Sequence, residues 1–342
     1  MTTAETVKKD KRLERLDRGI KVRCEGVYGL ATWRELCFLT LPHTLFIGII
    51  LLLPLFLDPY WQRVFSIAGV YALLALSFDF LAQYVGLVCL GLSLFVGCGG
   101  YMAAIFTDYF GFPPLLAVPV ATVVGAAICT LCLYPCLRLR GIYFAIISLM
   151  IPMMAKNIII ALNVLGGSEG ITALPPLPTV WYFDQYFILG IMICILFAVR
   201  RLVIEDVGLV FRAIKDNDQA VRASGINITV NKAKAVFIAA LIGCFGGAYL
   251  CHFYGVVGTS LFALDYTILP IAATVMGGSG TLVGPVVGAL ILLPLSEYLR
   301  DFGQLRVVAY CLILIGFMVY KPEGLMNYIT RKYEQFEHWK EV

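Results

Sequence analysis

The chain has 342 residues, of which 60% are hydrophobic and 14% charged, and its mean hydropathy is +0.87. Soluble domains carry roughly 25% charged residues, so this composition excludes an ordinary soluble protein with a polar surface. The formal net charge of +4 says little by itself, and we expect no nucleic-acid partner.

Apolar runs of about 17 to 23 residues recur along the chain and match the ~20 residues that a helix needs to cross a membrane. Because lipid offers no hydrogen-bond partners, the backbone of each run must satisfy its own polar groups, which predicts helices. The predicted spans are 41–57, 63–82, 86–106, 113–135, 141–163, 181–200, 232–254, 262–277, 282–299 and 304–320. The expected fold class is all-α: a polytopic transmembrane bundle of about nine or ten spans, with one short segment that is broken or re-entrant.

The chain divides into three predicted parts. Residues 1–40 form a charged N-terminal extension, which either sets orientation or is attracted to anionic lipid. The first apolar run ends without a signal-peptide cleavage site. Residues 41–326 form the transmembrane domain, which contains a polar segment at 201–231, and residues 327–342 form a short tail.

The basic residues are distributed unevenly. Nine of the 26 lie in residues 1–40 and seven in 200–234, whereas Arg63, Arg300 and Arg306 fall on the other side of the predicted spans. Cytoplasmic loops carry the excess of Lys and Arg, so we expect both termini and the polar segment to be cytoplasmic. An even number of spans follows.

Glycines gather at three places within the predicted spans. They either allow helices to approach closely or break a helix where its backbone lines a cavity. Residues 262–284 are the best candidate for a broken helix, and a weak similarity between 94–101 and 241–249 leaves an inverted repeat open. The clusters are Gly86, Gly91, Gly97, Gly99 and Gly100; Gly243, Gly246 and Gly247; and Gly277, Gly278, Gly280, Gly284 and Gly288.

Few ionisable residues lie inside the spans: Asp79, Lys156, Asp265 and Glu297. Such residues are functional candidates because burying a charge in lipid is costly. The three acids lie near the ends of their spans, however, so the simpler interpretation is that they reach water.

Neither the cysteine pattern nor a search for phosphate-binding motifs points to a cofactor. Cys129, Cys132 and Cys136 form a C-x2-C-x3-C run on an apolar helix with no histidine nearby, where cysteine packs as a small hydrophobe. The chain has no G-x-x-x-x-G-K-[ST] loop for ATP. We therefore expect neither a metal nor a cofactor.

The polar segment is the strongest functional candidate. It reads RLVIEDVGLVFRAIKDNDQAVRASGINITVN, in which Asn217 or Asp218 can cap a short helix that ends near Gly225. A short helix with small side chains suits docking into a groove on another protein. The alternative is a solvated connecting loop.

This segment resembles the coupling loop of a known family, the M-type permeases of ABC importers for branched-chain amino acids. Residues 219–221 and Gly225 fall where ABC importers place E-A-A-x-x-x-G, with Gln for Glu and Val for the second Ala. The similarity covers roughly residues 65–326. Further similar stretches are LRGIYFAI at 139–146, GGSEGI at 166–171, MGGSGTLVGP at 276–285 and KPEGL at 321–325.

The resemblance implies a non-enzymatic permease subunit in the inner membrane. Its partners would be a second, H-type permease, two cytoplasmic ATPase subunits and an extracytoplasmic solute-binding protein. The residues expected to couple to the ATPases are Lys215, Asp216, Gln219, Ala220, Val221 and Gly225. The residues expected in the substrate pathway or its outer gate are Gly91, Ser93, Tyr101, Tyr143, Gly166, Gly167 and Glu169.

Two departures from the family pattern leave the solute open. Leu92 replaces a family histidine, and Asp79 stands where asparagine is common, a feature linked to the related urea permeases. Urea or short amides are therefore an alternative substrate class. A stand-alone secondary transporter or channel would need coupling charges deep in the membrane, and an intramembrane enzyme would need clustered Asp, His or Cys.

Overall fold

The protein's structure, a computed structural model, describes most of the chain between residues 58 and 303 and small pieces beyond it. The described parts are residue 48, residues 58–139, 141–176 and 181–303, residues 308, 311–312, 315–317 and 319, and residues 324–328. Several parts of the predicted organisation lie wholly or mainly outside these residues: the extension 1–40, the spans 41–57 and 304–320, and the tail 327–342.

Helices form almost all of the described structure, which confirms the all-α fold class. The one pairing of extended residues in the described part is an isolated bridge between Ile171 and Val257. The helices are α3 (Pro59–Asp79), α4 (Leu92–Asp108), α5 (Pro114–Leu133), α6 (Ile142–Leu162), α7 (Trp181–Ile204), α8 (Asp206–Asp216), α9 (Asp218–Ala223), α10 (Ile228–Tyr254), α11 (Asp265–Gly277) and α12 (Val283–Tyr298). Shorter helical turns are η1 (Phe80–Val85), η2 (Tyr134–Arg138), η3 (Thr259–Phe262) and η4 (Leu299–Phe302).

Five helical segments among the described residues are long and apolar enough to cross a membrane. They are Pro59–Val85, Pro114–Arg138, Ile142–Leu162, Asp184–Ile204 and Ile228–Tyr254. The helices α4 and α12 are apolar but shorter. These segments make the chain a multi-pass membrane protein.

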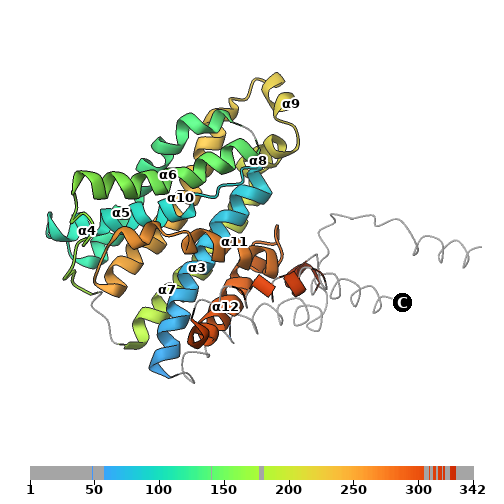
Figure 1. The fold of residues 1–342 in the computed structure, drawn as a ribbon. Helices are drawn as coiled ribbons and strands as arrows, with labels where there is room; N and C mark the ends of the chain where they lie inside the picture. The colour runs from blue at the N-terminus through green and yellow to red at the C-terminus, as the bar shows by residue number, and fades with distance from the viewer. Residues whose placement is uncertain are drawn as a thin grey trace, which may run out of the picture. The chain divides into compact units, whose positions relative to one another are not determined.

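The centre of the bundle is built by α3 and α10. The α3 helix packs against α7, α10, α11 and α12, while α10 also packs against α4 and α5. Figure 1 shows α3 passing between the group α4–α5–α6 and the α11–α12 pair. By contrast, α6 and α7 are mostly exposed, so their apolar faces are available to lipid or to another subunit.

The third predicted span begins later than its hydropathy indicated. The long helix that starts at Pro59 ends in η1, a π-helical turn, and Gly86 closes that turn with a left-handed φ of 77°. Residues 87–91 are not helical, and α4 begins at Leu92 rather than at residue 86. Hydropathy could not detect this break because residues 87–92 are as apolar as the helix that follows.

The predicted break after residue 277 is confirmed. Helix α11 has 13 residues, which at 1.5 Å per residue span about 20 Å, less than the ~30 Å of the hydrocarbon layer. Residues 278–282, here called the glycine turn, then lead into α12, which packs back against α11. The two helices form a hairpin, which favours the re-entrant alternative for 262–277.

Two of the predicted glycine clusters meet where α4 crosses α10. A Cβ atom on Gly99 would collide with the backbone of Cys244, and one on Gly247 would collide with the backbone of Val96. The backbones of α4 and α10 can approach this closely only because glycine has no Cβ atom. Close packing therefore explains these glycines. The segments whose similarity suggested a repeat are thus in contact with each other.

Replacing Gly99 tests this crossing. We expect Gly99→Ala to destabilise the protein by about 1–3 kcal/mol, because the added methyl group overpacks the contact with Cys244. Gly190 in α7 is the matched control, since nothing lies within 4 Å of a Cβ placed there. Gly190→Ala should be neutral or slightly stabilising because alanine favours helix. Thermal unfolding in detergent measures both variants, and equal melting temperatures would contradict the close crossing.

Candidate functional site

Two features lie at opposite ends of the long helix formed by α3 and η1. The first turns of α3 line a polar cavity, while η1 contacts the polar segment at residues 201–231. From Tyr60 to Tyr84 the helix rises about 36 Å. The two features are therefore separated by roughly the thickness of a membrane.

The polar segment folds into two helices where the sequence predicted one. Helix α7 continues to Ile204, and the unpredicted α8 follows before α9. Asn217 caps α9: its Oδ1 accepts hydrogen bonds from the N–H groups of Gln219 (3.1 Å) and Ala220 (3.2 Å), as the capping pattern predicted. Gly225 has a φ of 83° and ends this unit, also as expected.

A small apolar cluster holds α8 and α9 against the start of α10. It consists of Ile214, Val221 and Ile228, with Val210 packed against it. Among the six predicted coupling residues Val221 thus points inward and anchors α9. The other five are exposed: Lys215, Asp216, Gln219, Ala220 and Gly225.

Three contacts join α8 to η1. Lys215 Nζ donates a hydrogen bond of 2.7 Å to the carbonyl oxygen of Gln83. The rings of Phe211 and Phe80 meet edge to face, with centroids 5.9 Å apart. The guanidinium of Arg212 lies 5.4 Å from the centre of the Tyr84 ring. One face of α8 is therefore fixed to the π-helical turn by a charge, a ring contact and a cation–π contact.

The same end of the long helix also contacts the glycine turn. Tyr84 donates a hydrogen bond of 2.8 Å from its hydroxyl to the Gly280 carbonyl oxygen. Asp79 Oδ1 accepts a hydrogen bond of 2.7 Å from the Gly280 N–H. Gly280 has a φ of 85°, a conformation open to glycine. A continuous set of contacts thus runs from α8 through η1 to the α11–α12 hairpin.

Asp79 does not reach water, so the simpler interpretation of its place near the end of a span is wrong. Its relative exposure is 0%. Its role is to accept a hydrogen bond from the backbone N–H of Gly280 in the glycine turn, 201 positions later in the chain. The acid itself was the sign in the sequence of a buried contact, because a carboxylate in an apolar helix needs a buried partner.

Replacing Asp79 tests the hold on the glycine turn. Asp79→Leu removes the acceptor and leaves the Gly280 N–H unpaired, which should destabilise the protein by about 1–3 kcal/mol. Asp79→Asn is the control, since its Oδ1 can still accept the hydrogen bond, and we expect it to remain close to the unsubstituted protein. Thermal unfolding in detergent measures both. If Asn and Leu were equally destabilising, the hydrogen bond would not be the stabilising feature.

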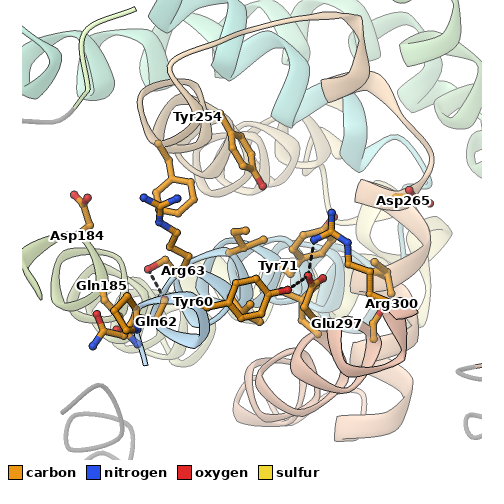
Figure 2. Close-up of a pocket in the computed structure, with 18 of the residues that line it drawn as sticks. Tyr60, Gln62, Arg63, Tyr71, Asp184, Gln185, Tyr254, Asp265, Glu297 and Arg300 are labelled. Carbon is orange, nitrogen blue, oxygen red and sulfur yellow. Dashed lines mark hydrogen bonds and ion pairs between the residues drawn. The ribbon is translucent and has the colours of Figure 1, made fainter. Parts of the chain in front are cut away.

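The polar cavity has a volume of about 800 Å³, within the range of small-molecule sites. Its walls come from the start of α3, the start of α7, the end of α10, the start of α11 and the end of α12. The polar residues around it include Tyr60, Gln62, Arg63, Asp184, Gln185, His252, Tyr254, Asp265, Glu297 and Arg300, most of which are labelled in Figure 2.

One side of the cavity is closed by a mutually bonded group. Glu297 Oε1 accepts hydrogen bonds from the Tyr60 hydroxyl (2.6 Å) and from Arg300 (2.7 Å). These contacts tie the end of α12 to the start of α3. Figure 2 shows this group on one side of the cavity, with Asp184 and Gln185 of α7 on the other.

The seven residues predicted for the substrate pathway do not line this cavity. Three belong to the buried part of α4 or its start, and four belong to α6 or the loop after it. The first group is Gly91, Ser93 and Tyr101, and the second is Tyr143, Gly166, Gly167 and Glu169.

The α4 group lies in the interior. Gly91 packs against the Ser148 carbonyl. Within the described part of the chain, the buried hydroxyls of Ser93 and Tyr101 have no hydrogen-bond partner, and the Tyr101 ring stacks on Phe262 with centroids 5.8 Å apart.

The second group lies at the surface, apart from Gly167. Tyr143 is 68% exposed on α6, and Glu169 is also exposed. Gly166 and Gly167 turn the chain with φ values of 83° and 53°, directly before Ile171 bridges to Val257.

The sequence did not predict the cavity residues as a site because they lie at the ends of predicted spans. The pairs Gln62–Arg63 and Asp184–Gln185 open their spans, and Glu297 and Arg300 close another. Polar residues at span ends are ordinary, so nothing in the sequence shows that these ends converge. Within the described ranges, no three His, Cys, Asp or Glu residues are grouped so as to hold a metal ion.

Comparison with known proteins gives the family. The family described as the permease component of branched-chain amino acid transport systems matches residues 61–320. The high-affinity branched-chain amino acid permease LivM of Salmonella typhimurium is 26% identical over 290 residues, covering 75% of this chain and 68% of that protein.

Two further relatives agree, and no solved structure matches the chain. Escherichia coli LivM is 25% identical, covering 76% of this chain and 68% of the relative. A probable LivM of Methanocaldococcus jannaschii is 24% identical, covering 75% of this chain and 90% of the relative. The chain therefore belongs to the family of branched-chain amino acid transport permeases, and it is a membrane-embedded transport subunit of an ABC importer rather than an enzyme.

Proposed function

We propose that this chain translocates branched-chain amino acids, the solutes in the names of its relatives, and that it does so across the inner membrane. In this proposal it pairs with a second, H-type permease. Two cytoplasmic ATPase subunits bind α8 and α9, and an extracytoplasmic solute-binding protein delivers the solute. Residues 1–40 and 327–342 are the cytoplasmic extension and tail of a transmembrane permease domain at 41–326.

The distribution of charge supports this orientation. Lys215, Arg212 and Arg222 lie on α8 and α9, and basic segments remain on the cytoplasmic side. The polar segment is then cytoplasmic, and the polar cavity at the other end of α3 opens toward the exterior. In this orientation the polar segment faces the ATPase subunits and the polar cavity faces the solute-binding protein.

The observation that carries the proposal is the contact between α8 and η1. Lys215, Phe211 and Arg212 hold the π-helical turn, and that turn holds the glycine turn through Tyr84. π-Helical turns occur frequently at functional sites. A displacement of α8 by the ATPases therefore has a bonded route to the α11–α12 hairpin, which forms one wall of the polar cavity.

The proposed coupling surface is formed by exposed residues of α8 and α9, with Gly225 at its edge. Ala220 and Gln219 present small and polar surface where a groove on an ATPase would receive the helix. Lys215 has two roles in this proposal, because its ammonium group bonds Gln83 while it lies beside the docking helix. Val221 supports α9 from within.

The proposed pathway also retains residues of α4. The buried hydroxyls of Ser93 and Tyr101 lack partners in the described chain, and polar atoms of this kind suit a solute that passes transiently. Gly91 allows the chain to approach α6 there. Tyr143, and the loop with Gly166, Gly167 and Glu169, remain proposed for an outer gate or an interface with the second permease.

A bulky side chain at Gly225 tests the coupling surface. We expect Gly225→Trp to abolish uptake while the protein still reaches the membrane, because tryptophan would occupy the docking face beside α9. Co-purification of the ATPase subunits and uptake of radiolabelled leucine by cells measure the two effects.

Gly111→Trp is the matched control for this experiment. Like Gly225, Gly111 has a positive φ (65° against 83°) and no atom within 4 Å of a Cβ placed on it. It lies between α4 and α5, at their ends away from the polar segment. The Gly111→Trp variant should retain the ATPase subunits. If Gly225→Trp retained both ATPase binding and uptake, the coupling role would be wrong.

The solute class is tested with the assembled transporter in vesicles. We expect ATP-dependent accumulation of leucine, isoleucine and valine and no accumulation of urea, because the cavity combines charged residues such as Arg63 and Asp184 with apolar ones such as Ile67 and Leu269. Radiolabelled solutes measure both classes in the same preparation. Accumulation of urea in place of leucine would establish the alternative substrate class.

A further inference from the structure

One wall of the polar cavity carries buried polar atoms that the described structure leaves unsatisfied. Gln185 is 1% exposed, yet neither its side-chain oxygen nor its nitrogen has a hydrogen-bond partner there. Asp184 Oδ1 is also buried without a partner. Buried polar groups in proteins are almost always paired, so two adjacent exceptions at a cavity wall mark a place where a polar ligand can bind.

The other side of the cavity does not share this feature. Glu297 is bonded to Tyr60 and Arg300, so its charge is already balanced within the protein. Figure 2 shows Asp184 and Gln185 apart from that group, with Arg63 drawn between them. A polar solute therefore gains most by binding at the α7 side.

The chemistry of the α7 side specifies the polar part of the solute. A carboxylate accepts hydrogen bonds and attracts a positive charge, while an amide offers one acceptor and two donors. An ammonium group can donate to Asp184 Oδ1 and to the oxygen of Gln185. A carboxylate on the same solute can accept from the Gln185 nitrogen and be attracted to the Arg63 guanidinium, which lines the same cavity.

The remaining walls specify the apolar part. Val64 and Ile67 of α3, Leu269 of α11 and Leu293 of α12 all line the cavity. They offer an aliphatic side chain a surface on which to lose water. A zwitterionic head beside an apolar tail is the chemistry of an aliphatic α-amino acid.

We propose that Asp184 and Gln185 form a solute site within the permease itself, which binds the ammonium group of an aliphatic amino acid entering from the binding-protein side. This inference rests on the proposed function and extends it. Selectivity then does not depend on the binding protein alone, because the permease discriminates against solutes without a cationic group. Urea cannot balance the charge of Asp184, and a simple carboxylate is repelled by it.

The test is equilibrium binding of radiolabelled L-leucine to the purified transporter without its binding protein. Unlabelled 3-methylbutylamine, which keeps the ammonium group, should compete, whereas 4-methylpentanoate, which lacks it, should not. Asp184→Asn should weaken leucine binding about tenfold or more, as expected for the loss of a charge-assisted hydrogen bond. Gln185→Leu should also weaken binding, since it removes both polar atoms at similar volume.

Asp108→Asn provides the matched control. It makes the same charge change at an exposed position that ends α4, outside the cavity, and it should bind leucine like the unsubstituted protein. Asp184 lies in the first turn of α7, where a carboxylate also stabilises the helix. If Asp184 only stabilised the helix, its replacement would alter assembly of the transporter, which gel filtration reports. A purely stabilising role would not make the amine compete better than the acid.

The inference would be overturned by equal competition by the amine and the acid, or by unchanged leucine binding in both α7 variants. Absence of leucine binding by the unsubstituted transporter would also overturn it. Uptake in the presence of the binding protein is measured separately on the same preparation. If leucine is taken up while the site fails these tests, the inference is wrong and the proposed function stands. If leucine is not taken up at all, the proposed function fails.

Discussion

The hydrogen bond from the Gly280 N–H to the Asp79 carboxylate joins the central helix α3 to the turn of the α11–α12 hairpin. Asp79 lies on the central helix, and Gly280 lies in the turn that reverses the α11–α12 hairpin. A turn of this kind exposes backbone polar groups, and lipid cannot satisfy them. The protein supplies a buried acceptor from α3, and Tyr84 supplies a donor for the Gly280 carbonyl. The turn of the α11–α12 hairpin depends on these two side chains.

The same contacts connect the glycine turn to the polar segment. The residues that hold the glycine turn belong to the end of α3 and to η1, and α8 packs directly on η1. The rest of the core is rigid by comparison, because α4 and α10 meet through glycines with no room for a side chain. A packed interface of that kind transmits displacement and does not absorb it. In the proposed function, the bonded path from α8 to the hairpin carries the movement that the ATPases would drive.

Much of the fold could be predicted because lipid imposes strong rules on sequence. Runs of apolar residues predicted the spans now seen as α3, α5, α6, α7 and α10, and the glycine cluster at 277–280 predicted the break after α11. Capping chemistry predicted a helix that starts at Asn217 or Asp218, and Asn217 is the residue that caps α9. The start of α4 and the existence of α8 were missed. The first occurs within a uniformly apolar stretch, and the second required recognition of an amphipathic period in a segment treated as a loop.

The sequence by itself determined the membrane class and the helical break after residue 277, because these depend on local composition and spacing. The tertiary structure alone brought Asp79 to the glycine turn, and it alone gathered the ends of five helices around the polar cavity. Asp184, Gln185 and Arg63 are ordinary span-end residues until α3 and α7 are packed together. Their chemistry depends on which distant residues share their cavity, and no local pattern in a single sequence records that proximity.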